Sequence, residues 1–385
     1  MRLTMQDRKT LTKALAEQYQ RAGKKQKGQI LDQFVQATGY HRCDARRLLR
    51  NHGRKVMLTT QVVAQGDAHL RVRRKGRPRY GPQVVEALNK LWQWLDYINS
   101  KRLAAALSCV VPRLVQSRQL RLSQQVQNQL LEISPATIDR LLKPYRAKHA
   151  LKGRATTRPG TLLKHQIPIR TFSQWDDLRP GMFEMDLVSH DGGCAQGDHC
   201  FTLNLTDVAT GWTELAAVPN KAQTWVFEAL KALRERLPFD LLGLDSDNGS
   251  EFINHHLTEY CRQQHITFTR GRPGRKNGNC YVEQKNWSIV RRYAGYARYD
   301  TPDMCQTLNQ MYRLLSDFNN FFIPSAKLID KVRIGSKTIK RYDTPKTPYH
   351  RLMDSHAITK TTKLKLTCQY KRLDLLSLIQ QIRNL

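Results

Sequence analysis

Two different spacings of hydrophobic residues divide the chain. Apolar residues follow a helical spacing in residues 30–49 and again in residues 138–142. Around residues 183–188, and again in residues 201–205, apolar and polar residues instead alternate, which predicts short strands. The pattern therefore predicts a helical N-terminal part followed by a core that contains both strands and helices.

The core is predicted to contain strands and helices in the order βββαβαβα. Its first three strands, the last of them at Trp212–Val218, are close enough in sequence to form an antiparallel meander. The elements that follow are a helix at Gln223–Arg236, a strand at Leu241–Leu244, a helix at Asn254–Gln264, a strand at Ile266–Thr269 and a helix at Val282–Tyr293. This order is that of a ribonuclease-H-like α/β domain, in which helices flank a mixed five-stranded sheet.

A helix-turn-helix pattern lies near the N-terminus. A polar helix at about Met5–Gln20 and a break at Gly23–Gly28 precede it, and Thr38–Tyr40 supplies its turn. Its second helix carries four arginines and is predicted to enter a DNA major groove. These arginines are Arg42, Arg46, Arg47 and Arg50. Helical hairpins also occur in proteins that do not bind DNA, so a packing role is the alternative.

A second helix-turn-helix pattern ends near residue 147. Ser134 is its predicted N-cap, Pro135 takes the first helical position, and Pro144 is expected to end the helix. Arg140 and Lys143 remain on the outside of this helix and are candidate DNA contacts.

A cationic run at Arg71–Arg79 precedes this second pattern. Gly76 and Pro78 exclude a regular helix there, so the run suits an extended arm. Such an arm could place arginines in a DNA minor groove, and a basic linker is the alternative. The candidate DNA contacts in this arm are Arg74, Lys75, Arg77 and Arg79.

The charge of the chain changes sign in the core. The 385 residues carry a net charge of +32, which predicts a polyanionic partner such as double-stranded DNA. Residues 176–300 hold 14 basic and 17 acidic side chains, although both flanking segments are strongly basic. Carboxylates between two DNA-binding flanks would repel phosphate unless they bind metal ions, and an ordinary acidic surface is the alternative.

The cellular location is predicted to be the cytoplasm. The eight cysteines form no CxxC pair and are expected to be reduced thiols. The N-terminus lacks the apolar run of a secretory signal, and the longest apolar stretch, Leu103–Val111, is too short to span a membrane.

Three carboxylates in the core are candidates for a metal site. Asp186 lies in the first strand, Asp247 begins a turn directly after the buried strand 241–244, and Glu283 lies on the last helix. If the first and fourth strands are neighbours, these carboxylates meet at one end of the sheet. Three close carboxylates need a compensating cation, and hard oxygen ligands favour Mg²⁺ or Mn²⁺. Asp245 is the competing candidate for the position of Asp247.

Three segments around these carboxylates resemble the signature motifs of integrase-type DDE recombinases. They are EMDLVSHDGG, LDSDNGSEF and RPGRKNGNCYVEQKNW, and 35 residues separate Asp247 from Glu283, as is typical of that family. The resemblance covers residues 180–300 and extends more loosely to the N-terminal region and to the segment NFFIPSAKL. The chain is therefore similar to bacterial insertion-sequence transposases.

The resemblance implies a function. Asp186, Asp247 and Glu283 would bind two Mg²⁺ or Mn²⁺ ions and catalyse cleavage at the ends of a mobile element, followed by transfer of the new 3′ hydroxyl into target DNA. Such recombinases usually act as homo-oligomers because two DNA ends must be joined. A nuclease of the same fold without strand transfer, and a non-catalytic DNA-binding regulator, are the alternatives.

Further DNA contacts are expected near Glu283. Retroviral integrases, which are distant relatives, carry lysines one and two turns beyond this residue, where Trp287 and Val290 stand here. Lys285 and Arg292 are the candidates instead, with a solvated helix surface as the alternative. The preceding basic loop adds Arg272, Arg275 and Lys276. Retroviral integrases also have an N-terminal zinc module, but the His and Cys spacing here does not match it, so no zinc is predicted.

The sequence predicts five regions. They are a helix-turn-helix region at 1–70, the arm and second helix-turn-helix at 71–147, a linker at 148–175, the catalytic core at 176–300 and a basic C-terminal region at 301–385. The last region is expected to contain a strand pair around Gly335–Ser336 and a final helix at about Leu373–Leu385.

Overall fold

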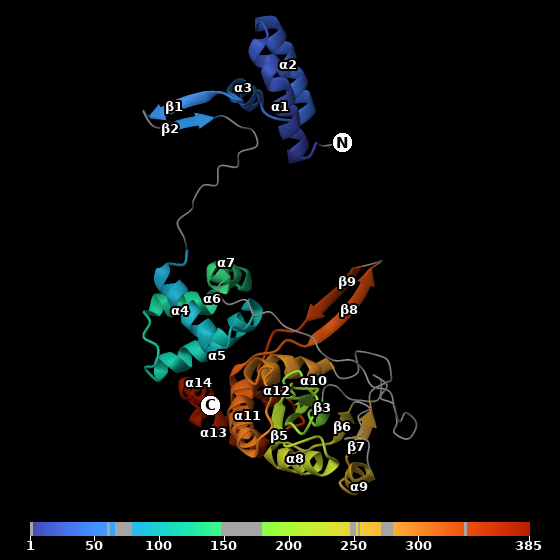
Figure 1. Cartoon of the computed structure of the whole chain (residues 1–385). Coiled ribbons are helices and arrows are strands. Elements are labelled where there is room, and N and C mark those ends of the chain that lie inside the picture. The colour runs from blue at the N-terminus through green and yellow to red at the C-terminus, as the bar shows by residue number, and fades with distance from the viewer. Residues whose placement is uncertain are drawn as a thin grey trace. The chain divides into compact units, whose positions relative to one another are not determined.

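A computed structural model divides the chain into two compact units, Met1–Arg79 and Tyr80–Leu385 (Figure 1). It describes residues 3–59, 62–65, 79–147, 179–246, 252, 255–270, 280–334 and 337–385. In these ranges no helix has the length and apolar character needed to cross a membrane. Asp247, the linker 148–175 and most of the cationic arm lie outside the described residues.

The first unit contains three helices and a two-stranded hairpin. They are α1 (Met5–Arg21), α2 (Lys24–Thr38), α3 (Arg42–Asn51), β1 (Lys55–Thr59) and β2 (Val62–Gln65). Phe34, Ala45 and Leu49 are fully buried among the three helices. Helices α2 and α3 form the predicted helical hairpin, in which Gly39 adopts a left-handed φ of 68° and ends α2.

The predicted break before this hairpin is wrong. Helix α2 already begins at Lys24, and only Gly23 lies outside it as the N-cap. Lysine and glutamine are good helix formers, so a lysine-rich segment with a single internal Gly28 continues as a helix. The hairpin β1–β2 was not among the predicted elements.

The second unit begins with four helices. They are α4 (Pro82–Trp94), α5 (Ser100–Gln116), α6 (Gln124–Glu132) and α7 (Pro135–Arg146). Ser134 caps α7 as predicted, because its hydroxyl accepts a hydrogen bond from the backbone N–H of Thr137 at 3.3 Å. The prediction that Pro144 ends this helix is wrong. This proline lies inside the last turn, where the loss of a single backbone hydrogen bond leaves α7 intact to Arg146.

The five-stranded mixed sheet predicted from the sequence forms the centre of this unit. Its strands are β3 (Met182–Ser189), β4 (Phe201–Asp207), β5 (Thr213–Val218), β6 (Gly243–Ser246) and β7 (Thr267–Arg270), in the order β5-β4-β3-β6-β7. The first three form the antiparallel meander, and β6 and β7 are parallel to β3. The first and fourth strands of the core are thus neighbours, as the metal-site hypothesis requires.

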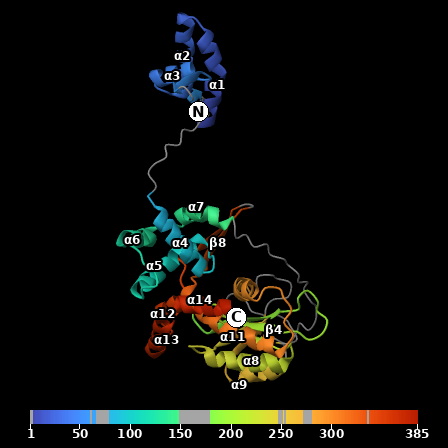
Figure 2. The same ribbon diagram turned by 60° about the vertical axis from the view of Figure 1, so that its left-hand side comes forward.

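Helices cover both faces of this sheet. On one face, α8 (Gln223–Arg236) and α9 (His255–Gln263) pack over Phe183, Met185 and Leu244 (Figure 2). The other face meets α11 (Pro302–Phe322) and a helix made of α10 (Cys280–Lys285) and a π-helical segment, η1 (Asn286–Arg291). Because side chains alternate along a strand, Glu184 and Asp186 of β3 point to this second face.

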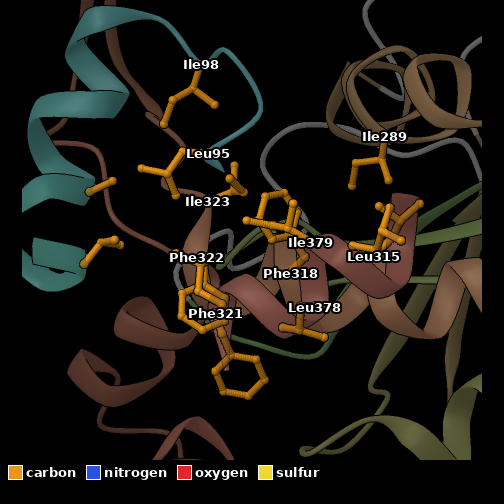
Figure 3. Packing of buried hydrophobic residues seen from close by; sticks show 14 of the residues in the cluster. Leu95, Ile98, Ile289, Leu315, Phe318, Phe321, Phe322, Ile323, Leu378 and Ile379 are labelled. Carbon is orange, nitrogen blue, oxygen red and sulfur yellow. The ribbon is translucent and has the colours of Figure 1, made fainter. Parts of the chain in front are cut away.

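The C-terminal part packs against the rest of the second unit. It contains β8 (Leu328–Ile334), β9 (Lys337–Tyr342), α12 (Pro348–Asp354), α13 (Lys360–Arg372) and α14 (Leu375–Asn384). The predicted strand pair and final helix are both present. Figure 3 shows Leu95 and Ile98 in one buried cluster with Phe322, Ile323 and Ile379, so the helices before and after the sheet share a hydrophobic core.

Candidate active site

Strand β3 fixes the start of the helix that carries Glu283. Glu184 on β3 is buried, and its Oε2 accepts hydrogen bonds from the backbone N–H groups of Tyr281 at 2.9 Å and Val282 at 3.0 Å. A carboxylate is favourable there because the first N–H groups of a helix lack partners within the helix and carry partial positive charge. Glu184 therefore anchors the N-terminus of α10 to the sheet.

A chain of amides holds Asp186 two residues further along the same face of β3. Asn286 donates from Nδ2 to Oδ2 of Asp186 at 2.6 Å, and its Oδ1 accepts from Nδ2 of Asn204 at 2.7 Å. Asn204 is fully buried and lies opposite Asp186 in the register of β3 and β4. The carboxylate of Asp186 is thus oriented by a side chain from the helix of Glu283.

Glu283 lies one turn before Asn286 on that helix. Residues three apart share a face of an α-helix, so Glu283 is on the side that Asn286 presents to Asp186. Partial burial raises the pKa of the Glu283 carboxyl above its usual value. In the described part of the chain, no side chain donates a hydrogen bond to this carboxylate. The structure therefore brings two of the three predicted carboxylates to the same side of the sheet.

Strand β6 ends beside Asp186. In the parallel register of β3 and β6, Glu184 pairs with Asp245 and Met185 pairs with Ser246, the residue before Asp247 in the sequence. Asp247 itself lies outside the described residues. The competing carboxylate, Asp245, is fully buried and accepts a hydrogen bond of 2.6 Å from the hydroxyl of Thr269 on β7. That bond gives Asp245 a structural partner in the neighbouring strand.

Among the described residues, no cluster of three or more His, Cys, Asp or Glu side chains is able to hold a metal ion. The loop after β3 contains His190, which is fully buried and lies 2.7 Å from the hydroxyl of Thr202. Burial lowers the pKa of His190 to about 4, so the ring is neutral and serves packing.

The arginines of α3 differ in their surroundings. Arg42 forms an ion pair with Asp32, and Arg47 pairs with Asp44 at 3.5 Å. Arg46 and Arg50 are exposed and lie one turn apart, and no ion pair of either is found in the described ranges. Among the described residues, Arg46 and Arg50 are therefore the arginines of α3 that face solvent without an ion-pair partner.

The remaining described candidates for DNA contact fall into two groups. Arg79, Arg140 and Lys143 are exposed. Lys285, in contrast, is buried and donates to Oδ1 of Asn319 at 3.1 Å, and burial lowers its pKa to about 7. Arg292 pairs with Asp96 at 2.5 Å.

Lys285 and Arg292 therefore do not form the shared DNA-facing surface that their spacing predicts. One reason is the π-helical segment between them. It has a different number of residues per turn from an α-helix, so a spacing of seven residues no longer places both side chains on one face. The candidates Arg74, Lys75, Arg77, Arg272, Arg275 and Lys276 lie outside the described residues.

Sequence reasoning overlooked Glu184, Asn204 and Asn286. Their signal was available: Glu184 and Asn204 are polar residues in strands without an exposed side chain, and Asn286 is three residues from Glu283. Buried polar side chains usually have a hydrogen-bond partner.

Comparison with known proteins identifies the core. Residues 177–276 match the family model described as the integrase core domain. Over 352 residues the chain is 38% identical to a protein of Sinorhizobium fredii named uncharacterized protein y4rM. The aligned region covers 91% of this chain and 96% of that protein. The chain belongs to the same family as y4rM. Together with the strand order, the match establishes a ribonuclease-H-like integrase core in the second unit.

Two solved structures of integrase cores are also similar to this chain. One is the catalytic core domain of BIV integrase, with 21% identity, coverage of 45% of this chain and 94% of that chain, and a TM-score of 0.30. The other is the HTLV-2 integrase catalytic core in complex with magnesium, with 16% identity, coverage of 39% and 92%, and a TM-score of 0.30.

Proposed function

We propose that the protein is a DDE transposase that binds DNA, cleaves the ends of a mobile element and joins them to target DNA. Asp186, Asp247 and Glu283 are the metal ligands in this proposal. The observation that carries it is the docking of the helix of Glu283 onto β3 through Glu184 and Asn286, on the face where Asp186 lies. The integrase core match over residues 177–276 supports the same reaction class.

The donor set fits divalent metal ions such as Mg²⁺ or Mn²⁺. Carboxylate oxygens are the ligands these ions prefer. The raised pKa of Glu283 reflects a partly desolvated carboxyl that a nearby cation would stabilise in its ionised form. When bound, a pair of such ions would polarise a phosphodiester and the oxygens that attack and leave it.

The chain's own residues position these ligands. Asn286 occupies one lone pair on Oδ2 of Asp186, and the backbone N–H of Leu187 donates to Oδ1 at 2.9 Å. Both oxygens of the Asp186 carboxylate are thus held in place by donors of this chain. Glu184 fixes the start of α10 and so the height of Glu283 above the sheet.

The chemistry that we propose has two steps at the same site. Water first displaces the 3′ oxygen of a phosphodiester at the element end, which leaves a 3′ hydroxyl and a 5′ phosphate. The hydroxyl then attacks the phosphorus of a target phosphodiester and displaces its 3′ oxygen. The hydroxyl loses its proton to solvent, and the leaving 3′ oxygen takes a proton from solvent. No covalent bond between protein and DNA forms. A homo-oligomer on DNA is part of the proposal, because two element ends must be joined to one target.

The positive charge of the chain supports DNA as the substrate. The net charge of +32 and the exposed Arg46 and Arg50 of α3 suit phosphate contacts and a major-groove helix. The second candidate is a nuclease of the same fold, which would release cut DNA without a joined product. The same carboxylates would serve it.

A joining assay tests the proposal. The substrate is a duplex that carries the inverted repeats flanking the coding sequence, with a plasmid as target and Mg²⁺ present. We expect joined product from the full-length protein, and a loss of at least about 1,000-fold in Asp186→Asn, Asp247→Asn and Glu283→Gln. Glu235→Gln on the exposed side of α8 is the matched control. Cut DNA without joined product would favour the nuclease, and undiminished activity in one triad variant would remove that residue.

A further inference from the structure

A cationic cavity lies on the helix of Glu283, away from β3. Its volume is about 360 Å³, and it is bounded by the start of α5, the α10–η1 helix and the base of the β8–β9 hairpin. Four cationic side chains line it, namely Lys101, Arg102, Lys285 and Lys340. Gln284 and Ser288, one turn apart, supply neutral hydrogen-bonding groups.

Two of the cations are held inside the protein. Lys285 is only 5% exposed, and its Nζ donates to the amide of Asn319, which is neutral. Arg102 is half-buried, and its Nε donates to the carbonyl of Pro324, which is also neutral. An amide and a carbonyl satisfy single donors but do not offset a buried positive charge.

The carboxylates nearest to these cations already have partners. Asp343, which also lines the cavity, accepts from Arg351 at 2.6 Å and from the backbone N–H of Lys327 at 2.6 Å. Asp96 pairs with Arg292 and also interacts electrostatically with Arg102, so one carboxylate is shared by two guanidinium groups. In the ranges that the structure describes, no ion pair is formed by Lys101, Arg102 or Lys285. The cavity therefore has an excess of positive charge that an anion would balance.

Two exposed lysines at the mouth extend this charge to the surface. Lys101 lies in the first turn of α5 and Lys340 lies on β9, and both are exposed. The mouth also receives the N-terminal end of α5, a 17-residue helix whose partial positive charge adds to theirs. An anion that enters from solvent thus meets cations at the rim and then Arg102 and Lys285 within.

We propose that this cavity binds a backbone phosphate of the DNA strand that is being cleaved. The proposal rests on the proposed function and adds a contact that neither the carboxylates nor the helix-turn-helix supplies. A helix with its side chains is about 10–12 Å wide. Measured along the duplex axis, where one strand carries a phosphate every ~3.4 Å, a phosphate on the far side of this helix is about three or four nucleotides from the cleaved bond.

The test replaces single phosphates of the substrate by neutral methylphosphonates. DNA binding is measured with the full-length protein and with EDTA present, so that the result does not depend on cleavage. With the wild-type protein we expect one position two to five nucleotides from the cleavage site at which the replacement weakens binding about 5- to 50-fold. In Lys101→Gln/Lys340→Gln that same replacement should have less than a 2-fold effect, because the contact is already lost.

The control variant is Lys360→Gln/Lys365→Gln on α13, which removes two exposed charges that do not line the cavity. It should retain the full effect of the methylphosphonate. Lys285→Met is a second test variant, since methionine fills a similar volume without charge. It should lose the effect, and its Tm should fall only moderately, because the buried Oδ1 of Asn319 loses its donor while the buried charge is removed as well.

Three results would overturn the proposal. They are the absence of a sensitive position in the wild type, a full effect in both cavity variants, and an equal loss in the α13 control. Inorganic phosphate provides the remaining arm. If it raises the Tm of the wild type but not of Lys285→Met, while no methylphosphonate position is sensitive, then the cavity binds a free anion and not DNA. If the proposed function is wrong but the cavity does bind a DNA phosphate, the wild-type protein will not cleave DNA, yet the methylphosphonate will still weaken binding.

Discussion

Asn286 donates a hydrogen bond of 2.6 Å to Asp186, and this contact joins the helix of Glu283 to the central strand of the sheet. The two residues are 100 positions apart in the sequence. Asn286 is itself held by Asn204 on β4, so the orientation of the Asp186 carboxylate depends on side chains from one neighbouring strand and one helix. Residues that orient metal ligands in this way commonly affect metal affinity as strongly as some ligands do.

Replacing Asn286 should weaken metal binding more than it weakens the fold. In Asn286→Ala, Asp186 loses its orienting donor, and we expect the Mg²⁺ concentration for half-maximal cleavage to rise about 10- to 100-fold. A metal titration of the cleavage rate measures this. Asn128→Ala on the exposed face of α6 removes an equal amide as control. An unchanged metal requirement in Asn286→Ala would show that Asp186 does not need this donor.

Replacing Glu184 should affect both stability and activity. Glu184→Ala leaves the N–H groups of Tyr281 and Val282 without their buried acceptor, which costs about 2–4 kcal/mol of unfolding free energy. Glu184→Gln keeps one acceptor oxygen, so a smaller loss is expected. Urea unfolding gives the stability, and the cleavage rate of the folded fraction gives the effect on Glu283. Equal stability of Glu184→Ala and the wild type would contradict the anchoring role.

The contribution of Glu214 to stability should fall as the pH rises from about 4.5 to about 7. Burial raises the pKa of Glu214 from 4.5 to about 7, against the opposing effect of Arg236, whose guanidinium lies 2.5 Å from the carboxylate. The folded state therefore keeps a proton that the unfolded state releases in this range, so folding is favoured at the acidic end. The contribution is about 1–3 kcal/mol.

Glu214→Gln tests this dependence, because glutamine has a similar shape and does not titrate. Between pH 5 and pH 8, urea unfolding should show that the variant loses less stability, or gains more, than the wild type. Glu235→Gln, which removes an exposed carboxylate, should keep the wild-type difference. If Glu214→Gln keeps it as well, Glu214 is ionised in the folded state throughout this pH range.

The unpaired arginines of α3 should contribute more to DNA binding than the paired ones. For Arg46→Gln and Arg50→Gln we expect the slope of log K against log[salt] to decrease in magnitude by about 0.9 for each lost phosphate contact. Arg42→Gln should change it less, since its guanidinium already pairs with Asp32. Lys13→Gln on α1 is the control for a general loss of charge. Identical slopes for all four variants would exclude α3 from the DNA interface.

The sequence predicted what local patterns determine. Alternating polarity revealed β3 and β4, and the buried run at 241–244 overlaps β6. The adjacency of β3 and β6 was only a condition of the metal-site hypothesis, and the sheet order meets it. Helices α4, α5 and α11 to α13 were not among the predicted elements. These helices contact one another across more than 200 residues of sequence: the guanidinium of Arg113 on α5 lies 4.4 Å from the ring centroid of Tyr370 on α13. Such contacts leave no local signature.

The candidate site shows the same division. Motif and spacing identified Asp186 and Glu283 in the sequence, but not the residues that hold them. Lys285 illustrates the reason: its position two residues after Glu283 suggested an exposed cation, whereas packing against α11 buries it beside Asn319. Burial of a charged side chain depends on the tertiary fold and cannot be derived from helical spacing alone.

The position of bound metal shows directly whether Asp186, Asp247 and Glu283 form one metal site. Crystals of the full-length protein grown with Mn²⁺ would be measured for anomalous scattering, with Asp186→Asn as the paired variant. We expect anomalous density within coordination distance, about 2.0–2.3 Å, of carboxylate oxygens of Asp186, Asp247 and Glu283, and its loss in the variant. Manganese bound elsewhere, or retained unchanged in Asp186→Asn, would show that these carboxylates do not form the metal site.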